Sequence, residues 1–244
     1  GFARTDVLLS WLDLPEAERP RFFTLYFDLV DTAGHRFGPD ALETNAAIAE
    51  VDAAVGRLVT GLDARGYAGR VNLVIVADHG MAAQAADAII ELDPRITPQQ
   101  AHVVWDGQFA AIQPLPGQVA AVEQALVGRS EHGECWRKAD LPARFDYRVH
   151  RRIPAIVCLA DLGWRYRSTQ LQQYATPAPG GHGWDPEAAE MAAVFIANGP
   201  AFRRGATLPS FENVSVYPLL AQLVGIAPEA NQGNLDDTRA ALAQ

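Results

Sequence analysis

The apolar residues in the first third of the chain follow two different patterns. Residues 21–28 (RFFTLYFD) form a short aromatic and β-branched run, which predicts a buried strand. From Ile48 to Leu62 the apolar positions recur every three or four residues, which predicts a helix. Residues 71–77 (VNLVIVA) then predict a second strand. This β-α-β order, with continuously apolar strands, predicts an α/β fold with a mostly parallel sheet and helices on both faces.

The pattern is less regular in the middle of the chain and returns near its end. From residue 87 to about residue 154 the apolar runs are short and irregular, apart from one helical stretch at 119–126, and we expect a small inserted lobe there. The apolar runs at 155–160 (AIVCLA) and 192–197 (AAVFIA) predict a return to the main sheet. A last helix is expected at 216–224.

Composition limits the classes of function. The 244 residues are 49% hydrophobic, enough for a core, and carry a net charge of -9 with Lys138 as the only lysine, which argues against binding of long nucleic acids. An acidic protein can still bind a small phosphorylated ligand when cations supply positive charge. The chain has no apolar run long enough for a membrane span, and its start resembles that of a fragment. Cys135 and Cys158 form either one disulfide or two buried thiols.

Three short clusters contain candidate metal ligands. They are Asp31-Thr-Ala-Gly-His35, Asp78-His79-Gly80-Met81 and Gly180-Gly181-His182-Gly183-Trp184. Asp78 and His79 directly follow the second predicted strand, where ligands bind in open α/β sheets. In the first cluster Asp31 and His35 are expected to lie across a Gly-containing turn, and in the third the glycines around His182 would let the backbone approach a ligand closely. Each cluster alone also fits an ordinary cap, turn or surface role. Together they offer oxygen and nitrogen ligands without thiolate, a set that suits zinc best, then manganese or iron.

These clusters and their order resemble the nucleotide pyrophosphatase/phosphodiesterase family of the alkaline phosphatase superfamily. The resemblance rests on Tyr26, on Asp31-x-x-x-His35-x-x-Gly-Pro, on Asp78-His79-Gly-Met and on Gly-His182-Gly. It extends to residues 191–202 and 211–217, which are similar to the family's closing strand and helix. Residues 1–244 therefore resemble the C-terminal portion of the catalytic domain of a bacterial member, with the inserted lobe at about 87–154.

The resemblance implies an alkaline phosphatase-like fold and two Zn²⁺ ions in the complete site. Asp31, His35 and His182 would bind one ion, and Asp78 and His79 would bind the other. The nucleophilic Thr or Ser of the family lies upstream of the first cluster. The hydroxyl residues in this part of the chain do not match the sequence context of that nucleophile; they are Thr5, Ser10, Thr24 and Thr32.

Tyr26 matches a family position that lines the nucleotide pocket, although a tyrosine in a strand can also be a core residue. His102, His132 and His150 match no family ligand and are expected to be surface or hydrogen-bonded core residues.

The activity implied by the resemblance is zinc-dependent hydrolysis of phosphodiester or pyrophosphate bonds in small nucleotides. It would release a nucleoside 5'-monophosphate through a phosphoryl-enzyme on the upstream Thr or Ser. The partner implied is the missing N-terminal segment of the same protein, and the implied location is periplasmic or secreted.

Two alternatives stay open. The first is a catalytically incomplete metal-binding fragment, because the nucleophile is absent. The second is another superfamily enzyme that acts on a phosphomonoester, a phosphonate, a sulfate or a lipid diester, or as a phosphomutase, because these share the metal ligands.

Overall fold

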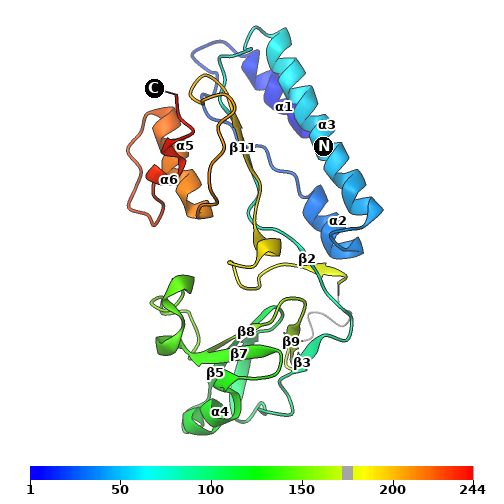
Figure 1. Cartoon of the computed structure of the whole chain (residues 1–244), viewed down its shortest axis with the longest axis vertical. Helices are drawn as coiled ribbons and strands as arrows, with labels where there is room; N and C mark the ends of the chain where they lie inside the picture. The colour runs from blue at the N-terminus through cyan, green and yellow to red at the C-terminus, as the bar shows by residue number, and fades with distance from the viewer. Residues whose placement is uncertain (172–177, 244) are drawn as a thin grey trace. The chain divides into compact units, whose positions relative to one another are not determined.

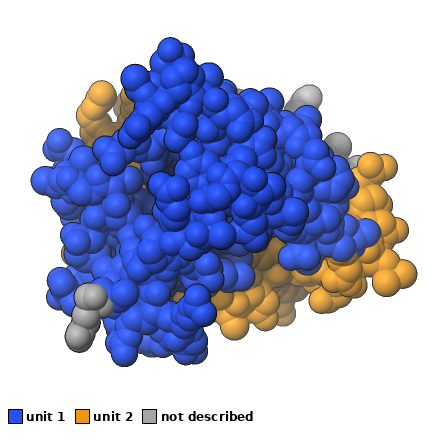
Figure 2. Space-filling model, turned by 90° about the horizontal axis from the view of Figure 1, so that it is seen from above, with its two compact units in different colours: residues 1–30, 46–78, 193–244 blue, residues 31–45, 79–192 orange. Residues whose placement is uncertain are grey.

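The computed structural model describes residues 1–171 and 178–243, and these fall into two compact units (Figures 1 and 2). Unit 1 comprises residues 1–30, 46–78 and 193–244, and unit 2 comprises residues 31–45 and 79–192. Unit 1 contains the following elements: α1 (Phe2–Leu12), most of α3 (Leu42–Ala64), β1 (Leu73–Val76), β11 (Phe195–Asn198), η4 (Asn213–Ser215), α5 (Val216–Val224) and α6 (Asp236–Arg239). The predicted helices at 48–62 and 216–224 correspond to α3 and α5.

Helices α1 and α3 of unit 1 run parallel to each other. Arg57 of α3 pairs with Asp6 of α1 at 2.6 Å, and Arg65, just beyond α3, pairs with Asp13, just beyond α1, at 2.8 Å. The residue numbers of the partners rise together, which requires parallel helices. Between the helices lies an apolar cluster that buries Leu8, Leu9, Leu12, Leu58 and Leu62.

Strand β1 confirms the strand predicted at residues 71–77 and lies between helices on both faces. It pairs antiparallel with β11, with Leu73 opposite Asn198 and Val76 opposite Phe195. Leu73 packs against the cluster of α1 and α3. Val74, which points to the other face, packs against the cluster around Leu219 of α5.

The prediction of a buried strand at residues 21–28 is wrong. Among the described residues this segment is paired in no strand ladder, and its side chains alternate between partly buried and exposed. Phe23 and Leu25 pack against the cluster of α1 and α3, whereas Phe22 and Tyr26 are 52% and 66% exposed. The segment thus has the alternation of a strand, with one covered face, but no neighbouring strand to accept its backbone hydrogen bonds.

Unit 2 is built around a five-stranded antiparallel sheet in the order β4-β5-β8-β7-β6. Its strands and the other elements of the unit are β2 (Ala82–Ala83), β3 (Ile89–Glu91), β4 (Ala101–Trp105), β5 (Phe109–Pro114), α4 (Val119–Leu126), β6 (Gly128–Arg129), β7 (Gly133–Arg137), η1 (Lys138–Asp140), η2 (Ala143–Phe145), β8 (Ile156–Ala160), β9 (Arg165–Arg167), β10 (Gly180–Gly181) and η3 (Ala189–Met191). The return to the main sheet predicted at 155–160 is wrong, because β8 lies between β5 and β7. The lobe boundaries of 87 and 154 stay a prediction.

The strands described here differ in direction from the parallel arrangement expected. Only β3 and β9 pair in parallel among the described residues, and the other ladders are antiparallel. The α/β class itself holds, since helices flank β1 on both faces.

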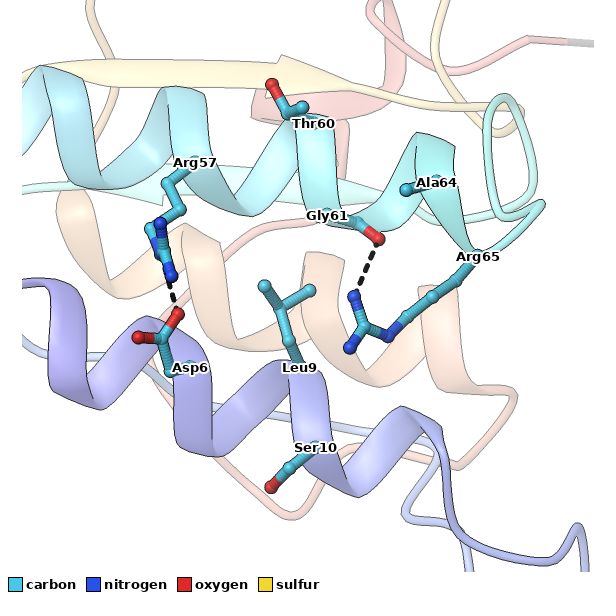
Figure 3. A pocket seen from close by; sticks show the side chains of 8 residues that line it. All are labelled: Asp6, Leu9, Ser10, Arg57, Thr60, Gly61, Ala64 and Arg65. Atoms are coloured by element: carbon cyan, nitrogen blue, oxygen red, sulfur yellow. Dashed lines mark hydrogen bonds and ion pairs between the residues drawn. The ribbon is translucent and has the colours of Figure 1, made fainter.

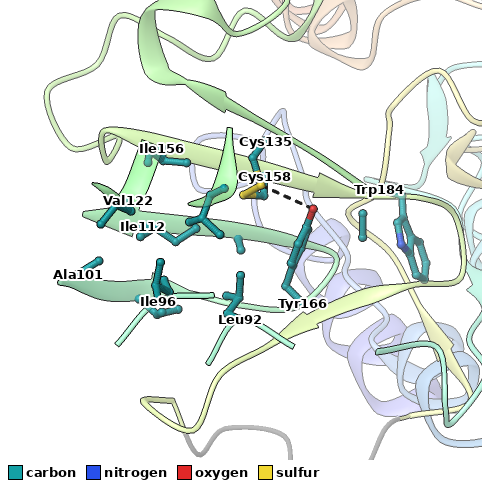
Figure 4. Close-up of a cluster of buried hydrophobic side chains, with 14 of the residues drawn as sticks. Leu92, Ile96, Ala101, Ile112, Val122, Cys135, Ile156, Cys158, Tyr166 and Trp184 are labelled. Atoms are coloured by element: carbon teal, nitrogen blue, oxygen red, sulfur yellow. Dashed lines mark hydrogen bonds between the residues drawn. A yellow bond between two sulfur atoms is a disulfide. The ribbon is translucent and has the colours of Figure 1, made fainter. Parts of the chain in front are cut away.

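The core of unit 2 contains a disulfide between Cys135 and Cys158 (Figure 4). The two cysteines are directly opposite each other on β7 and β8, and Cys158 is fully buried. The hydroxyl of Tyr166 lies 3.8 Å from the Cys135 Sγ atom. The disulfide resolves the choice that the sequence left open. No helix in the described part of the chain is long and apolar enough to cross a membrane.

Candidate metal centre

Helix α2 (Leu29–Phe37) brings the two residues of the first predicted cluster together. The sequence predicted a Gly-containing turn here, whereas the structure has a helix, so Asp31 and His35 lie one turn apart on the same face. The distance between Asp31 Oδ1 and His35 Nε2 is 3.4 Å. The helix therefore places a carboxylate and an imidazole side by side, as the metal hypothesis requires.

His182 joins this pair from a distant part of the sequence. Strand β10 pairs with β2, and at Gly180 a Cβ atom would lie only 2.2 Å from the carbonyl oxygen of Gly34 in α2. This close approach places His182 Nε2 at 3.7 Å from Asp31 Oδ1. It also places the Gly180 carbonyl oxygen 3.0 Å from His35 Nδ1. With the proton on Nδ1 to donate to that oxygen, the Nε2 lone pair of His35 is left for a metal ion.

The three residues fit a cation chemically. One ligand atom from each of Asp31, His35 and His182 lies within 4.8 Å of the other two. Asp31 Oδ1 is buried and accepts no hydrogen bond from the described residues, although it lies next to two imidazole nitrogens. A buried carboxylate oxygen without a donor is costly, and a cation held by the oxygen and both nitrogens would remove that cost. One carboxylate and two imidazoles are a common zinc ligand set.

The second predicted pair is placed in two different environments. His79 belongs to unit 2, where its ring stacks on His182 with the ring centroids 3.5 Å apart and an interplanar angle of 12°. Its Nδ1 atom is 2.9 Å from the Gly80 carbonyl oxygen. Asp78 belongs to unit 1, where its carbonyl oxygen accepts a hydrogen bond from Asn213 Nδ2 at 3.3 Å. The role of Asp78 and His79 as ligands of a second ion stays a prediction.

The glycines of the clusters have a structural task that sequence reasoning missed. The glycines around His182 were expected to let the backbone approach a ligand, but Gly180 lets two backbone segments of the chain approach each other. A Cβ at Gly80 would lie 2.0 Å from the carbonyl oxygen of Glu190. The available signal was the presence of a glycine within or beside every candidate ligand motif.

The other residues that the sequence analysis singled out have their own local environments. The Tyr26 side chain is 66% exposed, which excludes the alternative of a core residue, and its carbonyl oxygen accepts a hydrogen bond from Arg4. His132 stacks on Trp164. His150 Nδ1 accepts a hydrogen bond from a backbone N–H group. These contacts fit the structural roles expected for those histidines.

A pocket in unit 1 is a weaker candidate (Figure 3). Its charged lining residues are Asp6, Arg57 and Arg65. Arg57 is paired with Asp6 and Arg65 with Asp13, so a carboxylate already neutralises the charge that each guanidinium would offer to an anionic ligand. The group of Asp31, His35 and His182 is therefore the better candidate site.

The chain is similar to several characterised proteins. It is 32% identical over 241 residues to the bis(5'-adenosyl)-triphosphatase of Xenopus laevis, covering 98% of this chain and 52% of the relative. It is 33% identical over 243 residues to ectonucleotide pyrophosphatase/phosphodiesterase family member 3 of Rattus norvegicus, covering 95% of this chain and 27% of the relative. The chain thus spans about half the length of the first relative and about a quarter of the second.

Solved structures agree with this similarity. Murine ectonucleotide pyrophosphatase/phosphodiesterase 5 superimposes with a TM-score of 0.91 at 28% identity, covering 99% of this chain and 63% of that protein. An inactive variant of the same murine protein in complex with AMP gives a TM-score of 0.89 at 29% identity, with the same coverage. Residues 2–185 match the family described as type I phosphodiesterase/nucleotide pyrophosphatase, and the chain belongs to this family.

Proposed function

We propose that this chain forms the larger part of the catalytic domain of a zinc-dependent nucleotide pyrophosphatase/phosphodiesterase that releases nucleoside 5'-monophosphates. The observation that carries the proposal is the group of Asp31, His35 and His182, with the unsatisfied Asp31 Oδ1 among them. Family membership supports the reaction class. The AMP complex of the murine relative supports a small nucleotide as the substrate.

In this proposal Asp31, His35 and His182 bind one Zn²⁺ ion, and Asp78 and His79 contribute to a second. Bound zinc would supply positive charge for the phosphoryl oxygens and lower the pKa of the attacking hydroxyl. The chain itself fixes the ligands: the Gly180 carbonyl oxygen orients His35, and the pairing of β10 with β2 positions the His182 loop. Tyr26, with its exposed ring, is proposed to contact the nucleotide base.

The nucleophile in this proposal is a Thr or Ser upstream of the chain, where it would form the phosphoryl-enzyme. The hydroxyl residues near the start of the chain fit the task poorly. Thr5 is fully buried in α1, and its Oγ1 atom lies 3.5 Å from the Ala54 carbonyl oxygen. Ser10 donates its hydroxyl proton to the carbonyl oxygen of Val7 in the same helix.

The architecture of unit 1 supports an additional segment of the same protein. Helices α1 and α3 are parallel and each leads into an extended run, residues 21–28 after α1 and β1 after α3. Both runs pack on the same apolar cluster, through Phe23 and Leu25 in one and Leu73 in the other. We propose that a strand from the upstream segment pairs with residues 21–28 and satisfies their backbone groups.

Zinc binding is the first test of this proposal. We expect isothermal titration calorimetry to give tight binding of zinc by the chain. His182→Ala should weaken it by about a hundredfold or more, because loss of a ligand costs more than loss of an outer partner. His132→Ala, which changes another half-buried histidine of unit 2, is the matched control and should bind like the parent. Equal affinities for all three proteins would overturn the metal assignment.

Activity is the second test, and it separates the alternatives. The chain extended at its N-terminus should hydrolyse a nucleotide diester faster than p-nitrophenyl phosphate, while the chain of 244 residues should bind zinc without turnover. Preference of the extended protein for p-nitrophenyl phosphate would indicate a phosphomonoesterase of the superfamily. Absence of turnover in both proteins would favour a metal-binding protein without catalysis.

The location proposed is an oxidising compartment, periplasmic or extracellular. The disulfide between Cys135 and Cys158 supports it, because disulfides persist mainly in such compartments. Alkylation of the native protein purified from its source should find both thiols blocked. Quantitative alkylation without reductant would contradict the proposal.

A further inference from the structure

A loop of unit 2 between η2 and β8, residues 146–152, carries exposed apolar and basic side chains. Phe145 before the loop and Ile153 after it belong to one apolar cluster that also contains Leu141 and Val157. Both ends of the loop are therefore anchored in the core, and the residues between them are exposed. The loop presents its side chains from a fixed base.

The loop backbone is also held by hydrogen bonds. Lys138 Nζ donates to the carbonyl oxygen of His150, and His150 Nδ1 accepts from the backbone N–H of Arg152. The carbonyl oxygen and the Nδ1 atom of His150 are therefore already engaged in hydrogen bonds that hold the loop. The side chains left for outward contacts are those of Tyr147, Arg148, Val149, Arg151 and Arg152.

Two of these side chains are apolar and exposed. Val149 is 86% exposed and Tyr147 is 43% exposed. An isolated exposed apolar residue needs no explanation. Here, however, two of them alternate with arginines in the sequence Tyr147-Arg148-Val149-His150-Arg151-Arg152, a pattern in which apolar side chains can enter a membrane interface while basic ones contact headgroups.

The three arginines of the loop form no ion pair with the described residues. Other arginines of unit 2 are used in ion pairs: Arg129 with Asp161, Arg144 with Asp185 and Arg167 with Glu91. In contrast, Arg148, Arg151 and Arg152 take part in none of the ion pairs between described residues. No acidic residue occurs between Asp146 and Asp161 in the sequence.

This local positive charge contrasts with the net charge of -9 on the chain. At physiological ionic strength the field of a distant charge is screened beyond about 8 Å, so a surface in contact with the loop experiences mainly the loop's own charges, which are three arginines and Asp146. We propose that residues 146–152 form a docking loop for an anionic lipid surface, with the three arginines on the headgroups and Tyr147 and Val149 in the interface. This inference is independent of the proposed hydrolase activity.

Vesicle co-sedimentation tests the docking loop. The chain should bind vesicles of phosphatidylcholine mixed with phosphatidylglycerol and leave pure phosphatidylcholine vesicles unbound. Each arginine near an anionic surface contributes about fivefold in affinity. The variant Arg148→Gln/Arg151→Gln/Arg152→Gln should therefore lose about a hundredfold in partition coefficient.

A matched control separates the loop from net charge. The variant Arg21→Gln/Arg203→Gln/Arg204→Gln removes three other exposed arginines and should bind the vesicles like the parent. Val149→Ser should weaken vesicle binding by about tenfold, because one buried valine side chain contributes that much, yet leave binding to soluble heparin unchanged. Circular dichroism should show that all variants are folded.

Three results would overturn the inference. The first is no binding of the parent chain to the anionic vesicles. The second is equal loss of binding in both triple variants, which would indicate a response to net charge alone. The third is unchanged vesicle binding in Val149→Ser together with tight heparin binding, which would indicate a surface for soluble polyanions.

Discussion

Substitution of Gly180 by alanine should disrupt the metal group without touching a ligand. The added Cβ would lie 2.2 Å from the carbonyl oxygen of Gly34 and 3.3 Å from the sulfur of Met81. Carbon and oxygen atoms without a bond rarely approach within about 3.3 Å, so β10 and α2 must separate by about 1 Å. Since the obstructing atom belongs to the backbone of a helix, no side-chain rotation can relieve the overlap.

The free-energy cost of Gly180→Ala has two contributions. Overpacking of this kind costs about 1–3 kcal/mol. The hydrogen bond between His35 Nδ1 and the Gly180 carbonyl oxygen, now 3.0 Å, would lengthen, at a further cost of about 1 kcal/mol. Because this bond orients His35 as a ligand and β10 positions His182, we expect zinc affinity to fall by about tenfold to a hundredfold.

Zinc titration calorimetry of Gly180→Ala would measure this effect, with Gly56→Ala as the control. Gly56 lies within α3, and nothing is found within 4 Å of a Cβ added there, so its replacement should leave zinc affinity unchanged and slightly favour the helix. Parental zinc affinity in Gly180→Ala would refute the view that the close approach of β10 and α2 builds the site.

Three further predictions concern the core and the substrate. Burial raises the pKa of Tyr166 to about 12 from 10.0. The neutral phenol therefore stabilises the folded state below pH 10, and this contribution is lost as the pH rises through about 12. Urea unfolding should show that the free energy of unfolding falls by about 3 kcal/mol over this alkaline range, and Tyr166→Phe should remove this fall. Replacing both Cys135 and Cys158 by serine should lower the free energy of unfolding by about 3 kcal/mol, as measured by denaturant titration, because the unfolded chain regains the conformational entropy that a cross-link over this separation removes. In the N-terminally extended protein Tyr26→Ala should raise KM for a nucleotide diester by about tenfold with little change in kcat, because a stacked ring binds the base in ground and transition states alike; an unchanged KM would exclude Tyr26 from the nucleotide pocket.

The elements that the sequence predicted well are those whose pattern is local and long. Helix α3 covers 23 residues, and its apolar positions at intervals of three and four are enough to identify it. The prediction that β1 follows this helix was also correct. Leu58 and Leu62 lie in the core as the pattern requires, although Ile48 in the same pattern is 49% exposed.

Short apolar runs were misassigned because their environment is decided elsewhere in the chain. Residues 21–28 and β8 are both short runs rich in apolar residues, yet the first run has no ladder among the described residues and the second lies inside a five-stranded sheet. Periodicity cannot distinguish these cases, since the strand that pairs with a short apolar run lies elsewhere in the sequence. The pairing of Cys135 with Cys158 likewise depends on the register of β7 and β8, which no local pattern encodes.

The candidate site was predictable as residues but not as geometry, and Gly34 shows why. A glycine between Asp31 and His35 was taken to mark a turn, but α2 continues through it. A Cβ at Gly34 would lie 3.0 Å from the terminal carbon of Met81, and the backbone carbonyl oxygen of Gly34 is the atom that Gly180 approaches. Met81 and Gly180 each lie within two residues of a candidate ligand. Gly34 thus lies where three segments that are distant in the sequence pack together at the metal group. This packing can be inferred from the sequence only when all three motifs are considered together.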